Sequence, residues 1–353
     1  GASALDPSGA APSNLHALIG YFSLTELSRL RCLVGDHVGA LEALAPLTLP
    51  PRGDGSELVE QCALCHANTL YHAGVCYLML RRFEDASSVL CDLVALVARL
   101  LKPGTAVLRQ STASQVHKLS EKALSLLAIA VALVPGKAAG RARQMVAERH
   151  ADRLRRLEQG DVGCFEDVFE MACPKFVTAG AVDYSTGVNV GQDAFRAQVQ
   201  TFMDDVKQHL GFGALRAYMR LYTSIDLSTA PPGGAGPAAA GASAAAGPGG
   251  AVVPPMATQL LAFKHKLTQP RKAAAVAAAA APPAPDQPPP HVAPLEGERA
   301  LAADVHFFVD RRRVEISDVE VAQRSDGALA KSTSKLYETI AECQRVVDEN
   351  LRG

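Results

Sequence analysis

Cysteine and histidine side chains at short spacing are the residues of this sequence best suited to chemistry. The string Cys62-Ala63-Leu64-Cys65-His66 has the C-x-x-C-H spacing through which c-type haem is attached to proteins. His72 and Cys76 follow closely and could add ligands for a zinc ion. The string lies in a predicted helix, where its side chains fall at positions i, i+3 and i+4, and one helix rarely encloses a metal alone. We therefore interpret these residues as helix packing and expect no cofactor.

Motifs of the common enzyme classes do not occur in the sequence. It contains no phosphate-binding loop, no G-x-S-x-G nucleophile elbow and no H-E-x-x-H metal pair. The strings Gly211-Phe212-Gly213 and Gly53-Asp54-Gly55 each precede a predicted helix without following a strand, so we interpret both as turns between helices. Because 353 residues could hold an enzyme domain, the sequence favours a protein that is not an enzyme.

The composition is typical of a helical protein without a strongly charged partner. The sequence has 35 basic and 36 acidic residues, for a formal net charge of -1. This overall charge does not indicate a polyanionic partner. Aromatic residues reach only 5% and Trp is absent, which suits helices packed through Leu and Ala. The eight cysteines are dispersed, which favours a reducing, cytoplasmic environment. Residues 1–20 show no signal-peptide pattern, and the longest apolar run, 123–134, is too short for a membrane span.

Helical periodicity is the main structural pattern of the first two thirds of the chain. From Asn14 to about Leu227, apolar residues recur at helical spacing. They predict successive helices over residues 27–34, 38–44, 54–80, 83–101, 116–134, 138–157, 165–171, 195–209 and 215–225. Short turns between many helices indicate an α-solenoid or a bundle.

A degenerate repeat supports the solenoid. Gly74-x-x-Tyr77 followed by Ala86-x-x-x-Leu90 resembles the helix pair of a tetratricopeptide repeat, where glycine lets two helices approach closely. The segment from Gly35 through Ala40-x-x-x-Leu44 resembles a half-copy. Its alanine precedes Ala86 by 46 positions (86 − 40 = 46), which is longer than the usual repeat.

Two stretches rich in Ala, Pro and Gly, residues 228–255 and 270–296, interrupt this pattern and are predicted to be low-complexity linkers. Between them, Met256 to Leu267 is predicted to form one short helix with a basic end. After the second stretch the period changes to two, which predicts a β-hairpin with an arginine-rich turn. Its alternating apolar residues are Val305, Phe307, Val309, Val314 and Ile316.

The chain ends in a predicted helix with an apolar seam. Leu336, Ile340, Cys343 and Val347 recur at spacings of four, three and four. Such a seam requires a partner helix, and the sequence leaves open whether this chain or another chain supplies it.

Local basic residues cluster at two places. Arg311, Arg312 and Arg313 form the hairpin turn, while Lys264 and Lys266 end the short helix. Solvated charge at a turn and at a helix end is one interpretation. Contact with RNA phosphates, which positions a protein on RNA without reading its sequence, is the other.

A helical array followed by a basic helix, a hairpin and a terminal helix resembles the PCI-domain proteins. Several strings resemble, in the same order, the family of subunit L of eukaryotic translation initiation factor 3. They are YFSL from Tyr21, YLMLRRFEDA from Tyr77, LLAIAVALVP from Leu126, CPKF from Cys173, LRAYMRLYTSI from Leu215, QLLAFKHK from Gln259 and DVHFFVD from Asp304. Only about 20 residues precede YFSL, so the similarity is to the C-terminal portion of that family. The two Ala/Pro/Gly stretches stand where the family has winged-helix sequence.

The resemblance implies a mainly α fold with TPR-like helical repeats and a PCI-type winged-helix module. The implied divisions are an N-terminal extension at 1–20, repeats at 21–105, a PCI-like domain at 106–325 and a bundle helix at 326–353. The implied function is that of a non-catalytic scaffold subunit of translation initiation factor 3, which supports 43S assembly and mRNA recruitment. The implied partners are sister subunits and the small ribosomal subunit, contacted through the hairpin and the terminal seam.

Two other functions remain open from the sequence. One is a PCI scaffold of the proteasome lid or the signalosome, which would share the fold and differ in its partners. The other is a haem or metal protein that uses Cys62, Cys65 and His66.

Overall fold

A computed structural model describes residues 14–47, 63–101, 110–134, 140–180, 192–228, 255–271, 294–295, 298–301 and 305–317, and nine positions between 332 and 345. The chain divides into two compact units. The first comprises residues 1–214 and 258–303, and the second comprises residues 215–257 and 304–353. Among the described helices, none is both long enough and apolar enough to span a membrane.

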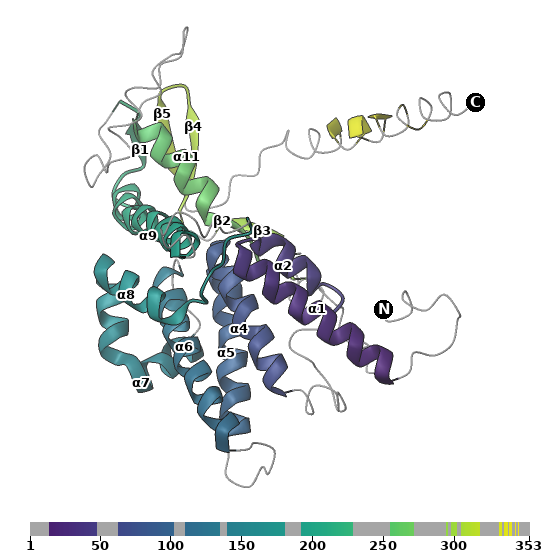
Figure 1. Cartoon of the computed structure of the whole chain (residues 1–353). Coiled ribbons are helices and arrows are strands. Elements are labelled where there is room, and N and C mark those ends of the chain that lie inside the picture. The colour runs from purple at the N-terminus through teal and green to yellow at the C-terminus, as the bar shows by residue number, and fades with distance from the viewer. Residues whose placement is uncertain are drawn as a thin grey trace, which may run out of the picture. The chain divides into compact units, whose positions relative to one another are not determined.

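The first unit is an array of helices in which consecutive helices from α1 to α8 pack side by side (Figure 1). This confirms the predicted mainly α fold. The helices that lie in this unit or enter it are α1 (Asn14–Val34), α2 (His37–Ala43), α4 (Ala63–Met79), α5 (Phe83–Leu100), α6 (Gln110–Leu133), α7 (Gly140–Glu158), α8 (Val162–Ala172), α9 (Asp193–Met219) and α11 (Pro255–Leu267).

The core of this unit is centred on α4, α5 and α6. Helix α6 contacts α5, α7 and α8, so its second half is covered on several sides. That half is the apolar run of the sequence, and Leu124, Leu127 and Ile129 are at most 1% exposed. A helix that is apolar around its whole circumference is stable only when it is surrounded in this way.

Two corners of the array confirm the repeat in atomic detail. After α1, the amide of Asp36 donates to Arg31 O at 2.9 Å, and after α4 the amide of Arg82 donates to Tyr77 O at 2.9 Å. The residues just before these donors, Gly35 and Arg81, have φ of +95° and +62°. This is the Schellman cap, in which the chain leaves a helix through a left-handed residue. The corners are 46 positions apart (81 − 35 = 46), the offset that also aligns the repeat alanines.

The close approach expected at Gly74 is present. A β-carbon on Gly74 would lie 2.6 Å from Leu90 Cδ2 and 2.9 Å from Leu90 Cγ. Tyr77, one turn later on α4, is 2% exposed, and Ala86 at the start of α5 is fully buried. The residues of the predicted repeat therefore form the contact between α4 and α5.

The predicted break at Gly211-Phe212-Gly213 is wrong. Helix α9 runs through all three residues and ends at Met219. The predicted helix at 215–225 is therefore only partly helical, and strand β1 (Ser224–Asp226) occupies its end. Each glycine costs a helix about 1 kcal/mol relative to alanine. Burial of Phe212, which is 8% exposed and whose ring lies 5.6 Å from that of Phe263, offsets this cost.

Parts of the predicted low-complexity stretch 270–296 belong to the first unit. Strand β2 (Thr268–Arg271) pairs antiparallel with β3 (Glu298–Leu301). The carbonyl of Pro294 accepts hydrogen bonds from Tyr77 Oη at 2.9 Å and from Arg82 Nη1 at 3.1 Å. Arg82 also forms a buried ion pair with Asp85, with Nη2 and Oδ2 2.6 Å apart. Composition alone predicted no order here, but the Pro294 carbonyl satisfies buried donors of α4 and of the turn between α4 and α5.

The second unit contains a three-stranded antiparallel sheet in the order β1-β5-β4. Strands β4 (His306–Asp310) and β5 (Arg313–Ser317) form the predicted hairpin, with Phe307 opposite Ile316 and Val309 opposite Val314. Strand β1 adds to the other side of β5 and was not predicted. The sheet therefore has β5 at its centre and β4 at an edge.

Candidate functional site

The hairpin divides its apolar residues between the inside and the outside of the second unit. Val305 and Val314 are 4% and 0% exposed, so they serve the core of the unit. Val309, on the edge strand, is 52% exposed. Phe308 is 41% exposed, although the alternating pattern had assigned it to the polar positions of the strand. Phe308 and Val309 are thus the exposed apolar residues of β4, on opposite faces of the strand, and only Val309 was predicted.

The remaining predicted residues of the hairpin have intermediate burial. Phe307 and Ile316, which face each other across β4 and β5, are neither buried nor fully exposed. An edge strand with apolar side chains and backbone groups at its rim is a template for pairing with another chain.

The terminal seam is exposed where the structure describes it. The nine described positions between 332 and 345 are helical. Leu336 is 62% exposed and Ile340 is 48% exposed, and Cys343 is an exposed free thiol. These three residues lie on one face of a helix because they are spaced by four and three. The fourth predicted residue, Val347, lies outside the described residues.

The basic residues differ in their surroundings. Arg311, Arg312 and Arg313 at the hairpin turn are all exposed, as is Lys264 at the end of α11. Lys266 instead forms an ion pair in which its Nζ lies 2.5 Å from Asp205 Oδ1, and its side chain is only 17% exposed. Its charge is therefore matched within the first unit.

The C-x-x-C-H string does not converge on one point in the part that the structure describes. Cys62 lies outside the described residues. Cys65 is half-buried, with its Sγ 3.6 Å from Thr25 Oγ1 on α1. His66 is 3% exposed, and burial lowers its pKa to about 4, so the ring is neutral at physiological pH.

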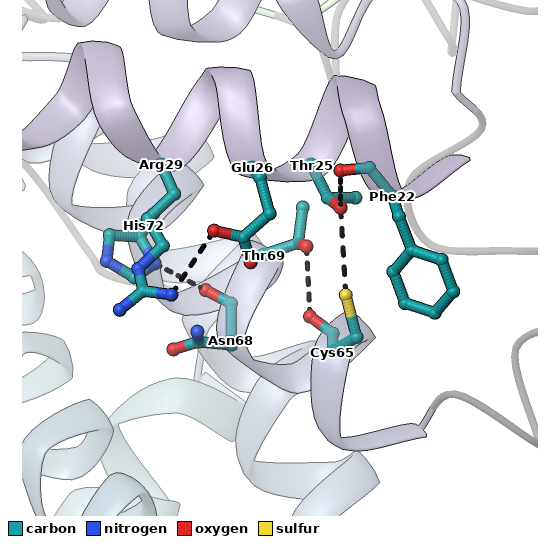
Figure 2. Close-up of polar contacts among 8 residues, drawn as sticks. All are labelled: Phe22, Thr25, Glu26, Arg29, Cys65, Asn68, Thr69 and His72. Atoms are coloured by element: carbon teal, nitrogen blue, oxygen red, sulfur yellow. Dashed lines mark hydrogen bonds and ion pairs between the residues drawn. The ribbon is translucent and has the colours of Figure 1, made fainter. Parts of the chain in front are cut away.

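Cys65 lines a cavity of about 410 Å³ between α1, α4 and α6. Figure 2 shows that its polar side chains mostly bond to their own helices. Thr69 Oγ1 donates to Cys65 O at 2.9 Å, and His72 Nδ1 lies 2.8 Å from Asn68 O. Burial lowers the pKa of His72, which keeps this ring neutral as well. Bonds of this i, i+4 kind satisfy buried polar groups locally, which supports the interpretation of the string as helix packing.

Comparison with known proteins assigns the chain to a family. The family described as RNA polymerase I-associated factor PAF67 matches residues 8–336. Over 329 residues, or 92% of the chain, the sequence is 28% identical to eukaryotic translation initiation factor 3 subunit L of Xenopus tropicalis. The identity to the subunit L proteins of Danio rerio and Homo sapiens is 27% over the same share of the chain.

The matched residues make up 51% of the Xenopus tropicalis and Homo sapiens proteins and 50% of the Danio rerio protein. The chain thus spans about half the length of the curated relatives it matches. Residues 8–336, which the family matches, include the helical array and the hairpin described above. By this match over most of its length, the chain belongs to the RNA polymerase I-associated factor PAF67 family, the family of eukaryotic translation initiation factor 3 subunit L.

Proposed function

We propose that this protein is a non-catalytic scaffold subunit of the translation initiation factor 3 complex in the cytoplasm. In this role it supports 43S pre-initiation complex assembly and mRNA recruitment to the small ribosomal subunit. The observation that carries the proposal is the similarity to initiation factor 3 subunit L over 92% of the chain. The exposed apolar surfaces of the second unit support a role in assembly.

The terminal helix is proposed to join a bundle with helices of sister subunits. Leu336 and Ile340 expose large aliphatic side chains on one helix face. Fully burying such a side chain contributes about 1.5–3 kcal/mol. A seam of three or four residues would therefore add several kcal/mol to association, which accords with a permanent subunit.

The hairpin is proposed to add a second contact with a sister subunit. Strand β4 lies at the sheet edge, and Phe308 and Val309 are its exposed apolar residues. Backbone pairing at an edge supplies affinity, while side chains next to it supply specificity. Arg311, Arg312 and Arg313 lie at the end of the same hairpin, where their charges suit contact with phosphates of RNA.

Affinity purification of the tagged protein from eukaryotic cytosol tests the proposal, with partners identified by mass spectrometry. We expect initiation factor 3 subunits, and co-sedimentation with the small ribosomal subunit. Recovery of proteasome-lid or signalosome subunits instead would show that the rival PCI scaffold is correct. Recovery of neither group would refute the scaffold function.

A matched pair of variants tests the seam itself. Leu336→Asp combined with Ile340→Asp places two charges on the seam and is expected to abolish recovery of the bundle partners. Lys335→Asp combined with Thr339→Asp places two acidic residues at exposed positions beside the seam and is the control. Equal recovery with both variants would exclude the seam as an interface.

A further inference from the structure

Three potential metal ligands from separate helices meet inside the first unit. Cys32 lies near the end of α1, His37 begins α2, and Cys76 lies on α4. One donor atom from each, two sulfurs and one ring nitrogen, all lie within 4.8 Å of one another. The cysteines are 0% and 1% exposed and His37 is 9% exposed. The cluster is thus enclosed by the fold and does not depend on surface residues.

The His37 ring is placed as a metal-binding histidine would be. Its Nδ1 is buried and makes no hydrogen bond within the described part of the chain. Its Nε2 lies 3.5 Å from Gln198 Oε1 on α9. A ligating histidine typically donates from its second nitrogen to an oxygen, which sets the tautomer and the ring orientation. A buried nitrogen without a hydrogen bond destabilises the folded state, and a bond to a metal ion would remove that cost.

The two cysteines can supply the charge that a divalent cation requires. Cysteine binds zinc as a thiolate, so binding of the ion would release the thiol protons of Cys32 and Cys76. The product, two thiolates and a neutral imidazole around M²⁺, has no net charge, which suits a buried site.

We propose that Cys32, His37 and Cys76 bind a zinc ion that fastens the corner between α1 and α2 to helix α4. Two sulfurs and one nitrogen form a ligand set that zinc accepts with a fourth position for water. Ligand atoms of a tetrahedral zinc site lie about 3.5–3.8 Å apart, so closure around the ion requires movements of about 1 Å. Of the cysteines and histidines near the C-x-x-C-H string, only Cys76 belongs to this site.

Metal analysis and cobalt substitution test the site in the unmodified chain. The protein, purified without chelator or affinity resin metal, is expected to retain about one zinc ion per chain. Apo-protein titrated with Co²⁺ should show a thiolate-to-cobalt charge-transfer band and the intense d–d bands of tetrahedral coordination. Removal of zinc by a strong chelator should lower Tm, and added zinc should restore it.

Two sets of variants locate the ligands. Cys32→Ser, Cys76→Ser and His37→Ala should each lose the zinc and the cobalt bands. Cys91→Ser removes a buried thiol on α5 outside the cluster and should retain both. The cobalt titration of unmodified protein remains decisive if a variant fails to fold. Sub-stoichiometric zinc together with no tetrahedral cobalt spectrum would overturn the site, as would a Cys32–Cys76 disulfide in the freshly purified protein.

Discussion

The contact between α4 and α5 makes a sharp prediction for Gly74→Ala. The new β-carbon would lie 2.6 Å and 2.9 Å from two carbons of Leu90, whose side chain is fully buried and has no solvent to move into. Overpacking of this kind costs about 1–3 kcal/mol. Replacing glycine with alanine inside a helix returns about 0.5–1 kcal/mol. We therefore expect Gly74→Ala to lower the free energy of unfolding by about 0–2.5 kcal/mol.

Helical glycines in open surroundings supply the control. A β-carbon on Gly20 in α1 or on Gly211 in α9 would have no neighbour within 4 Å. Gly20→Ala and Gly211→Ala should therefore raise stability by about 0.5–1 kcal/mol, the propensity gain alone. The sign should thus reverse between Gly74 and these two sites.

Urea unfolding followed by circular dichroism measures the effect as a shift of the midpoint at constant slope. Leu90→Ala by itself should cost about 2–5 kcal/mol. In the double variant with Gly74→Ala the new methyl has room, so the combined cost should fall below the sum by about 0.5–3 kcal/mol. If Gly74→Ala stabilised the protein as much as Gly20→Ala does, the close approach of the two helices would be refuted.

Three further predictions concern buried charges and the chain corner. Burial lowers the pKa of His66 and of His209 to about 4, below the ordinary 6.5, so the unfolded state binds more protons. The contribution of these two neutral rings to the free energy of unfolding should be fully present above pH 6.5 and should be lost as the pH falls toward 4. Replacing both histidines with Gln should flatten the plot of the urea midpoint against pH. Asp85→Ala removes the carboxylate of a buried ion pair and should lower stability by about 3–5 kcal/mol, whereas Glu42→Ala, at an exposed position of α2, should have little effect. Arg81→Gly relieves a left-handed backbone conformation that costs about 1–2 kcal/mol, and it removes a partly exposed ion pair with Asp205 that contributes up to about 1 kcal/mol. Tm should therefore rise slightly, and a fall would contradict this account.

Much of the first unit followed from local pattern. The spacing of apolar residues predicted most of its helices, and Gly74, Tyr77 and Leu90 predicted the contact between α4 and α5. Local rules failed at Gly211-Phe212-Gly213, because glycine weakens a helix only slightly and a buried Phe212 compensates. They also failed at Pro294 and Leu295, whose backbone carbonyls accept hydrogen bonds from side chains more than 200 positions earlier.

The candidate surfaces were also predicted in part from local pattern and decided in part by tertiary packing. The hairpin and the terminal seam were predicted because their residues follow one another at a fixed period. The exposure of Phe308 was missed, because a strand pattern assigns faces but does not reveal which face the rest of the unit leaves open. β1, a third strand contributed by residues 224–226, decides that β5 is central and β4 is the edge.

The sequence by itself determined the helical class, the repeat corner and the family, since these depend on short periods and ordered strings. The C-x-x-C-H string is a local pattern of the same kind, and its described side chains do not converge on one point. Only the tertiary structure brought Cys32, His37 and Cys76 within 4.8 Å. Metal ligands must surround an ion, and a single helix presents its side chains outward in a stripe. Helices from distant parts of the chain must therefore pack together before such a set can form.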